Sequence, residues 1–220
     1  KALHIHGFDL EAAQANAGLL SEAACCIQLE FGVFSAAPCY AIWVPGCLEV
    51  LSARSDHDRP ATSLLCSLSR GFCLLSTRRM DSLLRVANLA VARSSSDYIV
   101  EFPLDPLLEV RQHHWSTPVA VTVRRAAQNF GVASPLLGCD VAFVSNLPTD
   151  AGLGDSSGLI CATFLILCIR NKLETNSLYL QHLKEDDVVH AYLGSIRAGR
   201  DDSTLSGHVC TGSDADTQAG

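Results

Sequence analysis

The stretch SNLPTDAGLGDSSGL, residues 145–159, lies between an apolar run and a long apolar segment. The run CDVAFVSNLP (139–148) predicts a strand, and residues 155–172 predict a helix. Between them, Gly152 and Gly154 permit a positive φ and let a ligand approach the backbone closely. A strand, a glycine turn and a helix start together aim free N–H groups and the positive end of a helix dipole at an anion. The stretch therefore predicts a phosphate-binding loop.

Two familiar phosphate loops do not match this stretch. A Walker A loop ends in Gly-Lys-Ser or Gly-Lys-Thr, and the sequence has no Lys between residues 2 and 171. The dinucleotide fingerprint requires G-x-G-x-x-G, whereas the glycines at 152, 154 and 158 give G-x-G-x-x-x-G, which is one residue too long. A structural alternative stays open, in which Asp-Ser-Ser only caps a helix after a tight loop.

Composition and charge limit the class of protein. The chain has 220 residues, of which 48% are hydrophobic and 18% charged, so it is globular and can bury a substantial core. Its net charge of −7 argues against a non-specific nucleic-acid binder, which needs a basic surface. The partners are therefore expected to be small molecules, with any anion bound locally by backbone N–H groups.

The cysteines and the apolar runs indicate the compartment. Ten cysteines include no C-x-x-C pair, so they predict small buried thiols in a reducing cytosol and no zinc site. Four of them lie within apolar runs: Cys66, Cys73, Cys161 and Cys168. The longest apolar stretch, residues 159–169, would rise about 16 Å as a helix, which is half a bilayer core. With no signal-peptide pattern at its start, the sequence predicts a soluble, cytoplasmic protein with no membrane partner.

Hydrophobic periodicity favours an α+β fold without internal repeats, since strands dominate the first half and helices the second. Glycine and proline suggest that residues 40–58 form two runs broken at Pro45–Gly46, and that a hairpin turns near Arg70–Gly71. The remaining predictions are helices at 9–28 (capped by Asp9), 117–130, 155–172 and 176–194, and strands at 82–89, within 94–106 and at 139–148.

Several motifs resemble those of the GHMP kinases. LPTDAGLGDSSGL is similar to their second motif, L-P-x-x-A-G-L-S-S-S-A-L, and YAIWVPGCLEVLSARSDHD (40–58) is similar to the galactokinase signature P-G-R-x-N/E-L/V-I/L-G-E/K-H-T-D-Y. TSLLCSLSRGF resembles the strand pair after that signature, and residues 192–220 resemble the segment that leads to the third landmark. Motif order and spacing agree across nearly the whole chain, and the galactokinase and arabinokinase-like branch fits best.

The resemblance implies a fold and an activity. The fold would be that of the second domain of ribosomal protein S5, a mixed sheet with helices packed on one side. The activity would be the phosphorylation of a monosaccharide to its 1-phosphate, with ATP and Mg²⁺ as cofactors. The chain stops at Gly220, so the resemblance implies a single N-terminal domain, residues 1–220, without the family's C-terminal half.

The resemblance also assigns site residues. Asp56 and Glu49 would bind the sugar, and Asp214 or Asp216, on either side of Ala215, would supply the catalytic carboxylate. Ser156 and Ser157 would help to hold Mg²⁺. The ATP phosphates would lie on the loop made of Ala151, Gly152, Leu153, Gly154, Asp155, Ser156 and Ser157.

The match is altered at several family positions. Cys47 replaces the Arg that follows Pro-Gly and removes a fixed cation beside the reacting groups. Asp155 replaces a loop Ser and puts a negative charge where phosphate should lie, which is unfavourable unless Mg²⁺ bridges the two. The other departures are Ser52, Ala53, Arg54 and His57. Two hypotheses therefore stay open: an ATP-dependent sugar kinase, and a catalytically impaired relative that binds sugar or nucleotide weakly.

Overall fold

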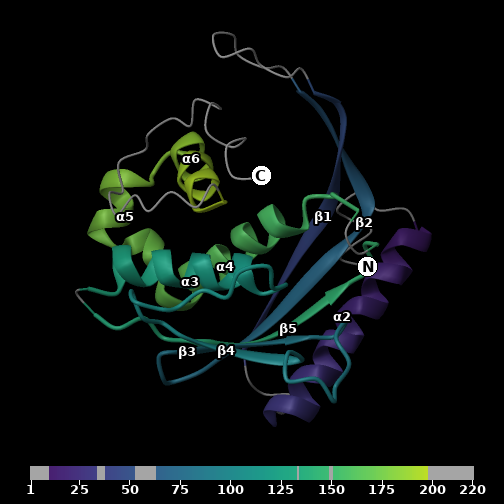
Figure 1. Ribbon diagram of the computed structural model, residues 1–220, viewed down its shortest axis with the longest axis horizontal. Coiled ribbons are helices and arrows are strands. Elements are labelled where there is room, and N and C mark those ends of the chain that lie inside the picture. The colour runs from purple at the N-terminus through teal and green to yellow at the C-terminus, as the bar shows by residue number, and fades with distance from the viewer. Residues whose placement is uncertain (1–9, 34–37, 53–62, 133, 149–150, 198–220) are drawn as a thin grey trace. The chain divides into compact units, whose positions relative to one another are not determined.

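The computed structural model of the chain describes residues 10–33, 38–52, 63–132, 134–148 and 151–197 (Figure 1). These residues combine helices with a mixed sheet, so the predicted α+β class is confirmed. The elements are α2 (Leu10–Phe31), β1 (Cys39–Ser52), β2 (Ser63–Arg78), β3 (Leu83–Asn88), β4 (Ile99–Pro103), α3 (Thr117–Phe130), β5 (Cys139–Ser145), α4 (Asp155–Asn171), the 3-10 turn η1 (Leu173–Thr175), α5 (Ser177–His182) and α6 (Asp186–Arg197).

The strands of the described residues form one five-stranded sheet in the order β1-β2-β5-β3-β4. β5 pairs antiparallel with β2 and parallel with β3, and β3 pairs antiparallel with β4. The centre of the sheet is therefore β5, and six of its seven residues are buried. A strand buried on both faces has a nearly continuous apolar sequence, as in CDVAFVS. The strand that carries the predicted loop is thus firmly held in the sheet.

Helix α2 packs on one face of this sheet, and Figure 1 shows it lying along β5. The helix contributes Leu19, Ala23, Cys26 and Ile27 to a buried cluster that also contains Cys73, Ala87, Ala142 and Val144. The pairing explains the cluster, because Cys73 opposes Val144 and Ala87 opposes Ala142, which places these small side chains on one face. Residues on the other face are also buried. Phe72 and Phe143 pack edge to face there, with 5.3 Å between their ring centroids.

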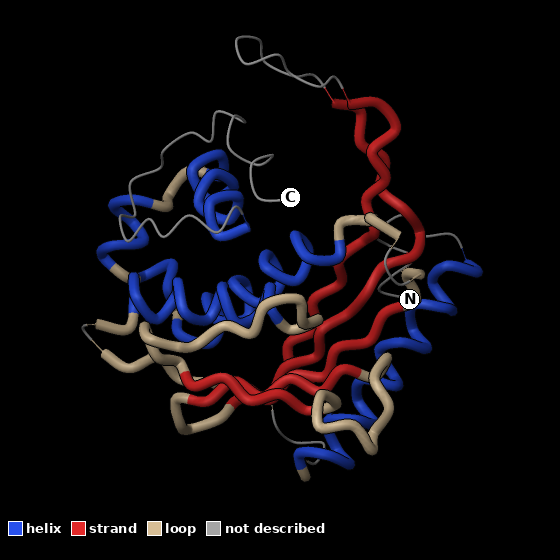
Figure 2. Tube along the Cα trace, viewed as in Figure 1, coloured by secondary structure: helices blue, strands red, loops and turns tan. Residues whose placement is uncertain are grey.

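The predictions for β1 and β2 were wrong about their breaks. β1 runs through Pro45–Gly46 and β2 runs through Arg70–Gly71 as continuous strands (Figure 2). A Cβ at Gly71 would overlap the Val44 carbonyl oxygen and lie 2.9 Å from Pro45 Cα. Gly71 therefore serves the close approach of two backbones and makes no turn. Pro45 is tolerated because β1 is an edge strand of the sheet.

The predicted helix at 176–194 is two helices, α5 and α6. Asn176 caps α5 by accepting a hydrogen bond from the Leu178 N–H at 2.9 Å. Leu183, which is fully buried, leaves helical geometry at φ −126° and ψ 24° and ends α5. α6 then begins with Asp186 and Asp187, whose charges suit a helix N-terminus. Burial of one leucine thus interrupts a pattern that looks continuous in the sequence.

The chain forms two compact units. The first unit contains α2, the segment 137–155 and most of the sheet. The second unit contains the end of β1 from Glu49, the start of β2 up to Cys66, the helices α3, α5 and α6, and α4 from Ser156 onward. Tyr192 of α6 is buried in the second unit and links two other helices, α4 and α3. The centroid of its ring lies 5.4 Å from that of Phe164, and its hydroxyl donates a hydrogen bond to Asn129 Oδ1 at 2.8 Å. The single domain expected over residues 1–220 stays a prediction.

The nine cysteines within the described residues are free thiols. Cys73 and Cys168 are buried as predicted, and burial raises the pKa of each to about 12. Cys47 and Cys161 are half-buried, whereas Cys25, Cys39 and Cys66 are exposed, so the prediction of buried thiols was wrong for these three. Among the helices of the described residues, none has both the length and the apolar character needed to cross a membrane.

Candidate phosphate site

The segment between β5 and α4 has the backbone geometry expected of an anion loop. Gly152 has φ +66° and Gly154 has φ +84°, which is the left-handed region that side chains rarely adopt. No atom lies within 4 Å of the position that a Cβ would take at Gly152. The two glycines are therefore required by conformation, and α4 begins directly after them at Asp155.

The start of the loop is fixed to β2 through Asn146. The Asn146 N–H donates to the Gly71 carbonyl oxygen at 3.0 Å, and the Gly71 N–H donates to Asn146 Oδ1 at 2.8 Å. The next N–H, of Leu147, donates to Ser145 Oγ at 3.1 Å. Three hydrogen bonds thus define the point at which the chain leaves the sheet. This accounts for the Asn that directly follows the strand in the sequence.

The far end of the loop is held by β1. The Cys47 N–H donates to the Leu153 carbonyl oxygen at 2.9 Å, and a Cβ at Gly154 would lie 3.5 Å from Cys47 Cβ. Position 47 is therefore in contact with the loop. The contact carries no side-chain charge, because a cysteine stands where a fixed cation was expected.

The first turn of α4 presents oxygen groups. Asp155 is half-buried, Ser156 is exposed and Ser157 is half-buried, and Asp155 supplies a negative charge at the positive end of the helix dipole. Carboxylate and hydroxyl oxygens suit Mg²⁺, which is usually bound by one or two protein oxygens together with substrate phosphates. Within the described ranges no group of three His, Cys, Asp or Glu side chains could hold a metal by itself. These residues therefore fit Mg²⁺ that arrives with a nucleotide.

A pocket opens beside this first turn, within the second unit. Its volume is about 200 Å³, and Ser157 lines it together with Ile160, Cys161, His190, Leu193, Gly194 and Arg197. His190, Gly194 and Arg197 lie at positions i, i+4 and i+7 of α6, which is one face of a helix. The sequence analysis did not select His190 or Arg197. The spacing of these residues in the sequence already places them on one face of a helix, but only the packing of α6 shows that this face meets Ser157.

The remaining site residues are less fully placed. Asp56, Asp214 and Asp216 lie outside the described residues. Glu49 is exposed on β1, and strand alternation puts its side chain on the same face of that strand as Cys47. The structure thus brings Cys47 to the loop and Ser157 to a pocket, whereas the roles given to Glu49 and the three aspartates stay predictions.

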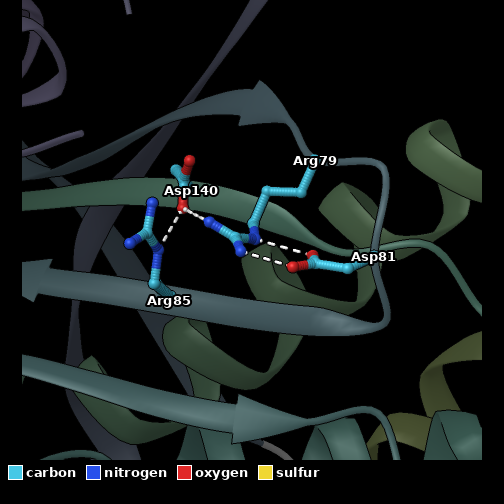
Figure 3. A network of polar contacts seen from close by, with 4 residues as sticks. All are labelled: Arg79, Asp81, Arg85 and Asp140. Atoms are coloured by element: carbon cyan, nitrogen blue, oxygen red, sulfur yellow. Dashed lines mark hydrogen bonds and ion pairs between the residues drawn. The ribbon is translucent and has the colours of Figure 1, made fainter. Parts of the chain in front are cut away.

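A cluster of four charged residues lies near the opposite end of β5, in the first unit (Figure 3). Asp140 Oδ1 accepts hydrogen bonds from Arg79 Nη1 at 3.0 Å and from Arg85 Nε at 2.6 Å. Arg79 also pairs with Asp81, and this hydrogen bond raises the pKa of the guanidinium and lowers the pKa of the carboxyl. The cluster joins the turn after β2 to β3 and β5, and its two arginines balance its two aspartates. It is a structural network.

Comparison with known proteins shows the fold. No family model matches the chain, and a sequence search of curated proteins finds no match. Among solved structures, it is similar to Lactococcus lactis galactokinase complexed with galactose, with a TM-score of 0.61 and 17% identity over 82% of this chain and 42% of the galactokinase. It is also similar to Methanococcus jannaschii mevalonate kinase, with a TM-score of 0.52 and 12% identity over 77% of this chain and 50% of that kinase. The chain thus spans half or less of the length of these enzymes.

Proposed function

Starting from the GHMP-kinase fold of this chain, we propose that it belongs to an ATP-dependent sugar kinase of the galactokinase or arabinokinase type. Such an enzyme phosphorylates a monosaccharide to its 1-phosphate in the cytoplasm. The observation that carries the proposal is the loop between β5 and α4. It has two left-handed glycines, it is held at both ends by main-chain hydrogen bonds, and it leads directly into a helix N-terminus.

Each part of the loop has a distinct role in this proposal. The N–H groups of residues 151–157 bind the phosphates, and the hydroxyls of Ser156 and Ser157 contribute to Mg²⁺ binding. Asp155 is compatible with a phosphate only where Mg²⁺ lies between the two negative groups. Bound Mg-ATP supplies the phosphoryl group and neutralises charge as that group is transferred. The loop itself contributes positioning and electrostatics.

The sugar side of the reaction rests on carboxylates. Asp56 and Glu49 accept hydrogen bonds from sugar hydroxyls, and Asp214 or Asp216 orients or deprotonates the attacking hydroxyl. The similar Lactococcus lactis enzyme is complexed with galactose, so galactose is the first sugar to test and arabinose the second. The expected partners are therefore a small sugar and ATP.

A second candidate function is favoured by one observation, which is the contact of Cys47 with the loop. A kinase of this type has a cation at that position, and losing one transition-state charge contact costs about 2.7–4 kcal/mol, or roughly a hundred- to a thousandfold in rate. The second candidate is a relative that binds nucleotide or sugar with little turnover. It keeps the loop but lacks the charge.

Two measurements separate these functions. Calorimetric titration with Mg-ATP tests the loop, and a coupled assay for ADP release with galactose and arabinose tests turnover. We expect Ser156→Ala combined with Ser157→Ala to weaken Mg-ATP binding at least severalfold. Ser21→Ala removes an exposed serine from α2 as a matched control and should change nothing.

The outcomes differ for each candidate. Binding with sugar-dependent ADP release supports the kinase, and binding without release supports the non-catalytic relative. If the chain does not bind Mg-ATP, the phosphate-loop proposal is wrong for both.

A further inference from the structure

Asn146 closes the antiparallel ladder between β2 and β5 with its side chain. The register pairs Phe72 with Ser145, so the next opposed pair is Gly71 and Asn146. In a hydrogen-bonded pair of this kind, the two residues exchange main-chain N–H and carbonyl groups. Here the Asn146 N–H donates to the Gly71 carbonyl oxygen, but the Gly71 N–H donates to the side-chain oxygen of Asn146, Oδ1, at 2.8 Å. The side chain therefore takes the place of a main-chain carbonyl group.

This substitution lets the main chain leave the sheet while the neighbouring strand stays satisfied. Gly71 is buried, and a buried N–H group without an acceptor is destabilising. Because the side chain of Asn146 accepts from this N–H, the backbone of Asn146 is not required to continue the strand. The chain can therefore turn at Asn146 and lead into the loop that contains Gly152 and Gly154, whose φ angles are positive.

The two ends of the loop are held by consecutive residues of β1, and all of these groups belong to the first unit. Gly46 lies against the start of the loop, because a Cβ there would be 2.6 Å from Leu147 Cδ2. The N–H of the next residue, Cys47, donates to the Leu153 carbonyl oxygen at the far end. A shift of the chain at Asn146 would therefore move one end of the loop relative to the other.

We propose that Asn146 is a positioning residue of the phosphate loop, because its side-chain bond to Gly71 sets the direction in which the loop leaves the sheet. The inference rests on the proposed function, since its ligand is the phosphate chain of ATP. A phosphate loop binds through main-chain N–H groups that are aimed before the ligand arrives, so its affinity depends on how its ends are held. An amide suits this position, because it offers an acceptor to Gly71 without a negative charge that would repel a phosphate.

The test compares two asparagines that end strands of the first unit. Asn146→Ala removes the acceptor of the Gly71 N–H, whereas Asn88→Ala removes the acceptor of the Ala90 N–H at the end of β3. Asn88 is a matched control, because its own N–H also bonds to a main-chain oxygen, that of Tyr98, and its turn contains none of the phosphate-loop residues. Urea unfolding measures the stability of both variants, and circular dichroism checks that they fold.

Calorimetric titration with Mg-ATP and hydrogen exchange of the Gly71 amide are the two readouts. We expect Asn146→Ala to weaken Mg-ATP binding about fivefold or more, and Asn88→Ala to change it by less than about twofold at a similar loss of stability. The Gly71 amide, followed by NMR of the isotope-labelled chain, should exchange about tenfold faster in Asn146→Ala. Asn146→Asp retains the side-chain oxygen and should restore slow exchange.

Each outcome separates the inference from the function beneath it. If the wild type binds Mg-ATP and Asn146→Ala binds equally well, the positioning role is refuted and the phosphate loop stands. Equal losses of affinity in Asn146→Ala and Asn88→Ala also refute it, because they would follow from stability alone. If Gly71 exchanges as fast in Asn146→Asp as in Asn146→Ala, the side-chain oxygen is not the anchor and the inference fails. If the wild-type chain does not bind Mg-ATP, the proposed function fails and the inference fails with it.

Discussion

Asp140 offers the sharpest test of what holds β5, the strand that carries the loop. Its side chain is only 6% exposed, and one oxygen accepts hydrogen bonds from two guanidinium groups. Asp140→Asn keeps the volume and removes the charge, so Arg79 and Arg85 lose a shared counter-charge. Removing one partner of a buried pair costs about 3–5 kcal/mol. Because the two arginines are 17% and 25% exposed, we expect the lower end, about 3 kcal/mol.

That loss is large enough to measure by urea unfolding. For a chain of this size, about 3 kcal/mol corresponds to a fall in melting temperature of roughly 6–12 °C. Asp81→Asn is the matched control, because its side chain is 53% exposed and an exposed ion pair contributes much less to stability than a buried one. The reasoning is refuted if Asp140→Asn unfolds within about 0.5 kcal/mol of the wild type, or if the two variants lose equal stability.

Three further predictions address the loop contact, the sheet and the thiols. Cys47→Arg should raise the affinity for Mg-ATP in a titration without lowering the melting temperature; unchanged affinity would show that position 47 does not face a bound phosphate. Gly71→Ala should lose about 3 kcal/mol or more in urea unfolding, because the added methyl overlaps the Val44 carbonyl oxygen, and a neutral result would rule out that close approach. Cys66 should be alkylated rapidly at pH 8 and Cys73 should not, since burial raises the pKa of Cys73 to about 12; peptide mass mapping distinguishes them. Equal alkylation of both thiols would contradict the burial of Cys73. Because burial raises the pKa of Cys73 from 9.0 to about 12, the free energy of unfolding that the buried neutral thiol contributes is fully present below about pH 9 and is lost as the pH rises towards 12.

The parts of the fold that follow local rules could be predicted from the sequence. The helix predicted at 117–130 matches α3 from Thr117 to Phe130, because Pro118 and Gly131 mark its two ends. The prediction of a hairpin turn was wrong at Gly71, because this glycine serves a contact between two strands. Gly71 looks like a turn residue in the sequence, but it permits the contact with Val44 from another strand, and no local pattern carries that information.

The candidate site divides in the same way. The loop could be predicted because its left-handed glycines and its helix start are consecutive in the chain. The contact of Cys47 with Leu153 was not predicted, since more than a hundred positions separate the two residues; the resemblance implied only that position 47 lies beside the reacting groups. Arg197 could not be found at all, because its relation to Ser157 arises from the packing of α6 against α4. Short-range geometry is encoded locally, whereas a pocket requires the assembled fold.

The hydrogen bond between the Cys47 N–H and the Leu153 carbonyl oxygen joins two backbone groups, so it is indifferent to the side chain at position 47. Any residue except proline can make it. The charge at this position can therefore change through one codon while the hydrogen bond to the loop is kept. A series of substitutions at position 47 would form a graded set of proteins that share one scaffold and differ in chemistry alone. Such a scaffold separates the evolution of a reaction from the evolution of the fold that carries it.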